Sequence, residues 1–276
     1  MKKVYENYVN GIKVLEKMTE LFPTAFGGKE EKKEKEVGLR TMWYETGEKK
    51  SEGNYKDGKL DGLHTGWYET GEKEYEGNFK DGKKEGLMTG WYEDGQKEFE
   101  GNYKNGKEDG IITNWYETGE KEYKGNFKDG KKEGQHLWWY EDGKKEYEAN
   151  YKDGQLVGLF LRWHENGHKR EEENYKDGQR DGQQIWWHAN GQKSYEGNFI
   201  KPKNRKKSKK DGLQISWYEN GNKQLEENHK NGKEEGLYTA WFENGNKQCE
   251  INYKMGKAIS SIDWDEEGNE IVRRNY

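Results

Sequence analysis

The residues of this sequence best suited to chemistry are carboxylates that recur at fixed intervals. A glutamate stands two positions after each of six successive tryptophans: Glu45, Glu69, Glu93, Glu117, Glu141 and Glu165. Paired carboxylates serve acid–base catalysis or bind calcium. A residue copied in every repeat meets the same environment each time, so no single copy is selected for catalysis. We therefore interpret these glutamates as solvated residues beside turns, and expect weak ion pairs across the turn with lysines such as Lys49 and Lys73.

Histidines are the other candidates for metal binding or catalysis. The sequence has six: His64, His136, His164, His168, His188 and His229. His164 and His188 hold the same position in adjacent repeats, and ordinary strand spacing places them about 10 Å apart, too far to share a metal. We interpret them as aromatic replacements for tyrosine. Without a nucleophile–histidine–acid arrangement, a phosphate-binding loop or zinc-ligand spacing, the sequence predicts a non-enzyme with no catalytic residue, cofactor, metal site or small-molecule substrate.

A basic run interrupts the regular pattern within an insertion at residues 200–211. Its charged members are Lys201, Lys203, Arg205, Lys206, Lys207, Lys209 and Lys210. Such a cluster could contact nucleic acid, anionic membrane or an acidic protein. The alternative is a solvated loop that touches nothing.

The composition excludes several classes of protein. Only 29% of the residues are hydrophobic and 37% are charged, which argues against a thick closed core, but 12 Trp, 19 Tyr and 8 Phe argue against disorder. With 49 basic and 54 acidic residues, no global charge draws the chain to nucleic acid or lipid. The lone Cys249 excludes an intrachain disulfide. Met1 to Phe22 lacks a signal-peptide pattern, so we expect a cytoplasmic protein.

An internal repeat dominates the sequence. Tryptophan recurs every 24 residues, and resumes the register after the insertion, at Trp43, Trp67, Trp91, Trp115, Trp139, Trp163, Trp187, Trp217 and Trp241. Each repeat has two turn signals, such as Asp94-Gly95 and Asn105-Gly106, which favour two-residue hairpin turns with two positive φ angles. Two turns in 24 residues leave room for two short strands. We therefore predict an all-β protein, an elongated single-layer antiparallel sheet of nine hairpin repeats over residues 38–257.

The ends of the chain depart from the repeat. Apolar residues at three- and four-residue spacing predict a short amphipathic α-helix within residues 1–26, acting as a cap. A charged linker follows at residues 27–37. The β-branched residues of 258–276 predict capping strands at the other end.

Alternation within the strands suggests which residues share a face of the sheet. We expect Leu63, Thr65 and Trp67 to form the core with the aromatic residues of the return strand. Gly77 lies between two of those aromatic residues and would let a cross-strand tryptophan lie flat. Ala149, Glu173 and Glu227 replace this glycine and predict different packing in their repeats.

On the opposite face we expect a partner-binding strip, because its residues vary between otherwise copied repeats. Trp, Tyr and Arg are the residue types that anchor protein interfaces, and exposed aromatic side chains reduce solubility unless covered. The predicted strip consists of Tyr116, His136, Trp138, Tyr140, Phe160, Arg162, His164, Trp186 and His188. Neutral drift of an unimportant surface is the alternative.

The repeat also resembles a known family. Trp217-Tyr218-Glu219-Asn220-Gly221 and the stretch from Glu52 to Lys59 are similar to the variant MORN repeat of bacterial proteins labelled YwqK-family antitoxins. The resemblance covers about residues 38–257. It implies an elongated antiparallel sheet used for protein binding or, in some relatives, lipid association. The antitoxin label implies an immunity-like inhibitor that neutralises a toxin or effector by direct contact, and the competing expectation is a scaffold on membrane or nucleic acid.

Overall fold

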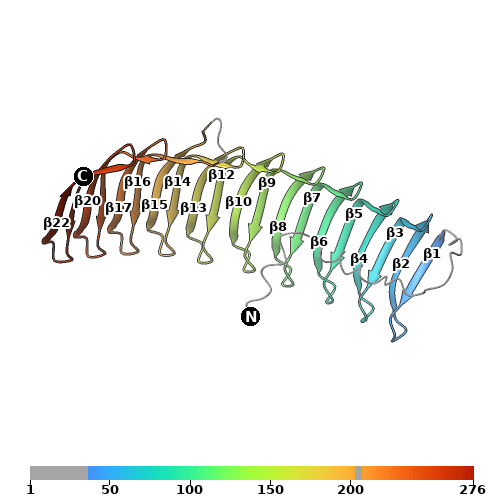
Figure 1. Ribbon diagram of the computed structural model, residues 1–276. Helices are drawn as coiled ribbons and strands as arrows, with labels where there is room; N and C mark the ends of the chain where they lie inside the picture. The colour runs from blue at the N-terminus through green and yellow to red at the C-terminus, as the bar shows by residue number, and fades with distance from the viewer. Residues whose placement is uncertain (1–36, 203–206) are drawn as a thin grey trace, which may run out of the picture. The chain divides into compact units, whose positions relative to one another are not determined.

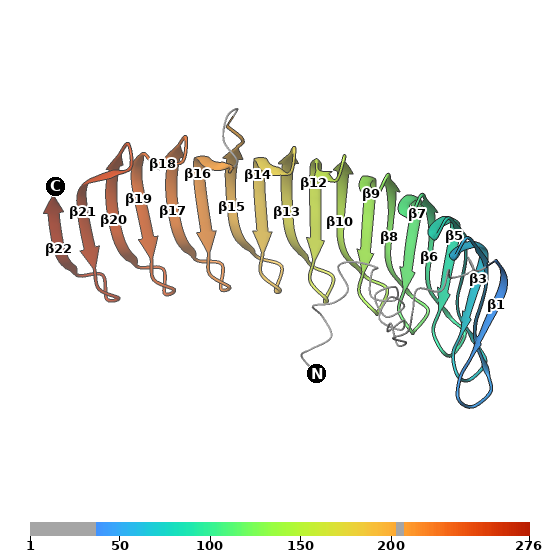
Figure 2. The same ribbon diagram turned by 45° about the vertical axis from the view of Figure 1, so that its right-hand side comes forward.

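The computed structural model describes residues 37–202 and 207–276. These residues form one antiparallel sheet, in which each strand pairs with its neighbours along the chain (Figure 1). The first and last strands are not paired with each other, so the sheet is open (Figure 2). The predicted all-β hairpin repeat is therefore confirmed. The predicted N-terminal helix at 1–26 lies outside the described residues, as does the 27–37 linker except Val37.

The strands are β1 (Gly38–Trp43), β2 (Lys49–Lys56), β3 (Lys59–Trp67), β4 (Lys73–Lys80), β5 (Lys83–Trp91), β6 (Lys97–Lys104), β7 (Lys107–Trp115), β8 (Lys121–Lys128), β9 (Lys131–Trp139), β10 (Lys145–Lys152), β11 (Gln155–Leu156), β12 (Gly158–Trp163), β13 (Lys169–Lys176), β14 (Gln179–Trp187), β15 (Lys193–Ile200), β16 (Lys209–Trp217), β17 (Lys223–Lys230), β18 (Lys233–Glu234), β19 (Gly236–Trp241), β20 (Lys247–Lys254), β21 (Lys257–Trp264) and β22 (Glu270–Asn275). The short β11 and β18 precede β12 and β19 and pair with the same neighbours, β10 and β17.

The two turns of each repeat have different geometries. In the second turn, Asp57 and Gly58 have φ angles of 53° and 77°, as expected for a two-residue hairpin turn. In the first turn only the glycine has positive φ: the Gly71 amide donates to the Tyr68 carbonyl over 3.0 Å, and the Tyr68 amide donates to the Glu72 carbonyl over 2.9 Å. This is a three-residue loop with a glycine bulge. The prediction of a two-residue turn here is wrong.

The strand register decides which residues share a face, because directly opposed residues point to the same side of a sheet. Gly66 lies opposite Tyr75 and His64 lies opposite Gly77. Leu63 is instead opposed by an asparagine. The predicted core, which combined Leu63 with the aromatic residues of the return strand, is therefore wrong. We call the side carrying His64 and Tyr75 the buried face, and the side carrying Leu63 the leucine face.

The core lies on the buried face. Tyr75, Phe79, Met88 and Ile112 are buried there although the sheet has a single layer. Space for them comes from the repeated glycine, since a Cβ added at Gly77 would lie 1.9 Å from the Met88 sulfur. The glycine therefore accommodates a side chain of the next repeat, and not a tryptophan as predicted.

Lysines and glutamates connect successive repeats on the leucine face. Lys49 Nζ lies 2.9 Å from Glu52 Oε2 and 5.0 Å from the ring centre of Trp67 in the next repeat. The same ion pair recurs at Lys73, and the same cation–π contact recurs there too. We predicted that these lysines pair with the glutamates two positions after tryptophan, and this prediction is wrong. Each lysine pairs instead with the glutamate three positions later on its own strand. Glu45 is exposed, as expected of a residue beside a turn.

Candidate protein-binding surface

The predicted strip lies on the buried face, on the same side as the core and not opposite it. The residue before the tryptophan is glycine in β3 and β5, at Gly66 and Gly90, but becomes Trp138, Arg162 and Trp186 in β9, β12 and β14. The strand register places these residues in one row. Trp138 lies opposite a tyrosine of β8 and a tyrosine of β10, and Arg162 lies opposite a glutamate of β13. The central repeats therefore carry large side chains where β3 and β5 carry glycine.

The aromatic members of this row stand in pairs across adjacent strands. Trp138 stacks on Tyr147 with 3.8 Å between ring centres, and Trp186 stacks on Tyr195 at 4.4 Å. Phe160 tilts against Tyr147 at 5.8 Å. Trp138, Phe160 and Trp186 remain partly exposed. We call these residues the aromatic platform; Lys132 Nζ lies 4.6 Å from the ring centre of Trp138, and the Arg180 guanidinium lies 5.3 Å from that of Trp186.

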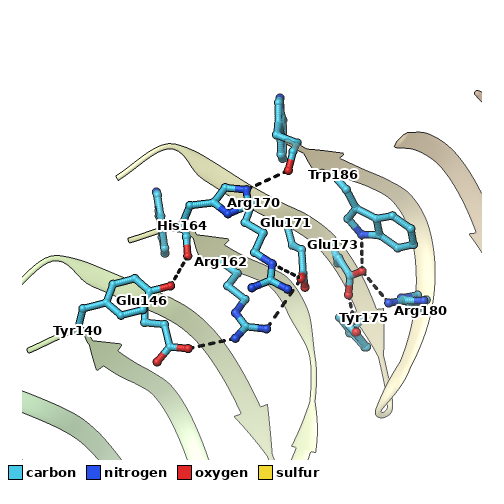
Figure 3. Close-up of polar contacts among 12 residues, drawn as sticks. Tyr140, Glu146, Arg162, His164, Arg170, Glu171, Glu173, Tyr175, Arg180 and Trp186 are labelled. Carbon is cyan, nitrogen blue, oxygen red and sulfur yellow. Dashed lines mark hydrogen bonds and ion pairs between the residues drawn. The ribbon is translucent and has the colours of Figure 1, made fainter. Parts of the chain in front are cut away.

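Arg162 lies opposite Tyr147 of β10. Its guanidinium is surrounded by other charged groups (Figure 3). Its guanidinium lies 3.1 Å from a carboxylate oxygen of Glu146 and 3.9 Å from one of Glu171. Arg170 adds a second cation, 3.3 Å from the same Glu171 oxygen. Because these carboxylates come from two different strands, they hold the Arg162 side chain in place while it stays 32% exposed.

Glu173 is the least expected residue of this region, because it replaces the repeated glycine and is only 1% exposed. Its carboxylate accepts hydrogen bonds from the Arg180 guanidinium at 2.8 Å, the Trp186 indole at 2.7 Å and the Tyr175 hydroxyl at 2.5 Å (Figure 3). Burial, followed by the hydrogen bond to Glu173, raises the pKa of Tyr175 to about 12. The hydrogen bond to Glu173 restrains the Trp186 ring. In the sequence, this network is marked by the replacement of the repeated glycine with Glu173.

Glu227 replaces the same glycine in a later repeat and forms a second buried network. Lys210 Nζ lies 2.7 Å from its carboxylate, and His229 Nε2 lies 3.1 Å away. Burial alone would raise the pKa of Glu227, but the hydrogen bonds from Lys210 and His229 outweigh it and lower that pKa. The prediction of different packing at these substituted glycines is confirmed for Glu173 and Glu227.

His136 is fully buried and cannot meet a partner directly. A carbonyl only accepts, so Nε2 donates to the Asn126 carbonyl at 2.9 Å, and Nδ1 accepts from the Tyr123 hydroxyl at 2.6 Å. Burial, with the nearby Lys132 charge, lowers the pKa of His136 to about 4. His136 is therefore a neutral core residue, which corrects its placement on a free surface.

Four other residues of the predicted strip connect repeats. Tyr116 and Tyr140 donate hydroxyl hydrogens to the carbonyls of the next repeat's tryptophan over 2.7 and 2.8 Å. His164 and His188 make the same contact through Nε2 at 3.0 and 2.9 Å. The interpretation of these histidines as tyrosine replacements is confirmed. Their polar atoms are engaged in the scaffold, which leaves Trp138, Phe160, Arg162 and Trp186 as the available part of the strip.

The basic insertion is partly attached to the sheet. Lys201 Nζ lies 2.7 Å from an Asp177 carboxylate, and Lys209 Nζ donates to the Asn231 carbonyl over 3.0 Å. Lys210 is engaged with the Glu227 carboxylate, whereas Lys207 is exposed. The remaining basic residues, Lys203, Arg205 and Lys206, lie outside the described residues. A role for this insertion stays a prediction.

Two other kinds of site are not seen in the described ranges 37–202 and 207–276. No three side chains of His, Cys, Asp or Glu come together there in a way that could hold a metal ion. Those ranges also contain no helix long and apolar enough to span a membrane.

The fold and this surface define a class of protein, an open sheet of tandem hairpins with a constant scaffold and variable rows on the buried face. The sequence matches the family described as "MORN repeat variant" at residues 36–57, 60–81, 84–105, 108–129, 132–153, 156–177, 180–201, 210–231 and 234–255. The chain belongs to this family.

Comparisons with individual proteins add little. No curated protein matches the sequence. Among solved structures, the chain is similar to "Crystal Structure of TcdB2-TccC3", with 9% identity over 87% of this chain and a TM-score of 0.19, and to "Crystal Structure of TcdB2-TccC3-Cdc42", with 10% identity over 86% and the same TM-score. In each case the match spans 16% of the other chain.

Proposed function

We propose that this chain is a non-catalytic protein-binding protein that holds a protein partner on its central repeats. One observation carries the proposal: the row that is glycine at Gly66 and Gly90 becomes Trp138, Arg162 and Trp186, whose side chains stay partly exposed. Large aromatic residues and a fixed arginine are the typical anchors of protein interfaces. Their supporting networks restrain the side chains before binding, which lowers the entropy lost on association.

We further propose that binding inhibits the partner, as an antitoxin or immunity protein does. Support comes from the similarity of the repeat to proteins labelled YwqK-family antitoxins, and from an architecture in which the residues copied from repeat to repeat build the scaffold. An inhibitor needs a large fixed contact surface and no chemistry of its own. The partner is then a toxic or effector protein.

The test uses Trp138→Ala/Phe160→Ala against a matched change on the other face, Leu213→Ala/Leu237→Ala. Each open reading frame adjacent to the gene is expressed with and without the chain, and growth is measured. We expect the unmodified chain and the leucine-face variant to relieve toxicity and to bind the purified toxic protein in calorimetry. The Trp138→Ala/Phe160→Ala variant should bind at least about tenfold more weakly. Equal binding by all three proteins would refute the assigned surface.

A further inference from the structure

Several asparagines in the turns stand directly before a glycine, and this pair of residues is chemically labile. In the described residues they are Asn105, Asn166, Asn190, Asn220, Asn231 and Asn244. Asparagine is a thermolabile residue, and the following glycine leaves its backbone nitrogen open to approach because it has no Cβ. All six asparagines are exposed, so access to water does not distinguish them. Their hydrogen bonds do.

The reaction is an attack within the chain, followed by hydrolysis. The glycine backbone nitrogen attacks the asparagine Cγ and loses its proton, the Cγ–Nδ2 bond breaks, and ammonia leaves with that proton, which gives a cyclic succinimide. Water then adds to one ring carbonyl and opens the ring to aspartate or isoaspartate. The rate depends on how often the side chain reaches the attacking nitrogen.

Four of the asparagines lie in the first turn of their repeats and are held through both polar atoms of the side chain. Asn220 Nδ2 donates to the Glu243 carbonyl of the next repeat over 2.9 Å, and Asn220 Oδ1 accepts from the Asn222 amide at 2.9 Å. The same two bonds hold Asn166, Asn190 and Asn244. Before Cγ can approach the glycine nitrogen, the leaving amide must give up its bond to the next repeat.

Asn105 and Asn231 lie in the second turn, and only their backbone is held. The Asn105 amide donates to the Glu85 carboxylate over 2.8 Å. The Asn231 amide donates to the Asp211 carboxylate over 2.8 Å. Within the described part of the chain, neither of the two asparagine side chains has a hydrogen-bond partner. These side chains are therefore free to turn toward the glycine.

The attacking nitrogen does not distinguish the two turns. The Gly106 amide donates to the Lys84 carbonyl over 2.9 Å, and the Gly221 amide donates to the Tyr218 carbonyl over 3.0 Å. One backbone hydrogen bond must open in either turn. The difference in reactivity therefore comes from the side-chain bonds.

The aspartate product fits the second turn. Aspartate already stands at this position in other repeats, with φ angles of 48° to 53°, at Asp57, Asp81, Asp129, Asp153 and Asp177. Asn105 and Asn231 have φ angles of 53° and 54°, so conversion to aspartate leaves the turn unchanged. At Asn220 the same conversion would remove a donor to the next repeat.

We propose that Asn105 and Asn231 are deamidation sites of the folded protein, and that the side-chain hydrogen bonds of the first turn protect the other four asparagines. Each conversion adds one negative charge at the tip of a hairpin. At Asn231 this charge arises beside Lys209, whose Nζ donates to the Asn231 carbonyl over 3.0 Å. Both turns lie outside β9 to β14, which carry the aromatic platform, so this proposal does not depend on the proposed function.

The test compares the folded and the unfolded chain. One sample of the full chain is kept folded at mildly alkaline pH for several weeks, and another is kept in urea; both are digested at low pH and mapped by mass spectrometry. We expect the folded chain to convert Asn105 and Asn231 at least about tenfold faster than the first-turn asparagines. Tenfold corresponds to about 1.4 kcal/mol, within the net value of one or two hydrogen bonds. In urea all six should convert at similar rates. Equal rates in the folded chain, or the same difference in urea, would overturn the proposal.

A matched pair of variants separates the effect of the turn from that of the neighbouring sequence. Asp153→Asn creates a new asparagine–glycine pair in a second turn, and Asp142→Asn creates one in the first turn of the same repeat. An amide replaces a carboxylate of equal size in both variants, and circular dichroism checks that they fold. We expect the new site of Asp153→Asn to convert at least about tenfold faster than that of Asp142→Asn. If the two new sites convert equally fast, the first turn gives no protection, and the proposal is wrong.

Discussion

The network around Glu173 allows the sharpest test of how the central repeats are built. The perturbation is Glu173→Gln, which removes the negative charge but keeps the size of the side chain. In the structure the carboxylate accepts three hydrogen bonds, and one of them comes from the Arg180 guanidinium at 2.8 Å. The amide leaves this cation without its charge partner.

The magnitude follows from burial. Breaking a fully buried ion pair costs about 3–5 kcal/mol. Glu173 is 1% exposed but Arg180 is 37% exposed, so the guanidinium regains part of its hydration from water. We therefore expect a loss of about 2 kcal/mol of unfolding free energy, the value of a hydrogen bond to a charged group. The double variant Glu173→Gly/Arg180→Leu should recover most of this loss, since the first repeat carries Gly53 and Leu60 at these positions.

The assay combines urea denaturation with amide hydrogen exchange, because a repeat array can open locally. Glu173→Gln should weaken protection in β13, β14 and β15 and leave β3 to β6 unchanged. Glu270→Gln, which breaks an exposed ion pair 2.9 Å long, serves as the control and should change nothing measurable. If the costs of the single variants Glu173→Gly and Arg180→Leu simply add in the double variant Glu173→Gly/Arg180→Leu, the two side chains are not coupled, and the account of the network is refuted.

Three further predictions concern the scaffold. Tyr92→Phe should lower the free energy of unfolding by about 1 kcal/mol, because it removes a 2.6 Å hydrogen bond to the Trp115 carbonyl in the next repeat. An unchanged midpoint in urea denaturation would show that this bond is not stabilising. Gly77→Ala should lower the free energy of unfolding by about 1–3 kcal/mol, because the added methyl group overlaps Met88. Adding Met88→Ala to this variant should restore part of the loss, and no restoration would contradict the contact. Burial lowers the pKa of His64 and His136 to about 4, below the ~6.5 of an unfolded chain. The unfolded state therefore takes up protons first, and their contribution to stability is complete above about pH 6.5 and declines toward pH 4. His64→Met/His136→Ile should have a shallower fall in unfolding free energy over this window, and identical slopes would refute the assignment.

The repeat period and the turn residues were sufficient to predict the strands. Asp57-Gly58 and its equivalents form the expected two-residue turns, because asparagine, aspartate and glycine tolerate positive φ wherever they stand in a hairpin. Such local preferences do not depend on the rest of the molecule. The first turn was predicted with the wrong length, since the same residue types also fit a three-residue loop with a bulged glycine.

The placement of the predicted strip opposite the core was wrong. Trp138 and Arg162 belong to a variable row, as expected, but that row lies on the core side. His136 shows why variation alone is a poor guide: it differs from its equivalents because each must fill the space over a glycine, not because a partner contacts it.

The period, the hairpins and the residues that differ between repeats can be read from the chain before it is folded, since they follow from local backbone preferences and from comparison of the repeats. The tertiary structure decided which face is buried and which contacts join the repeats. Alternation places residues on two sides of one strand, but only the pairing between strands shows which sides coincide. For that reason Leu63, expected in the core, lies in solvent, and His64 beside it is buried.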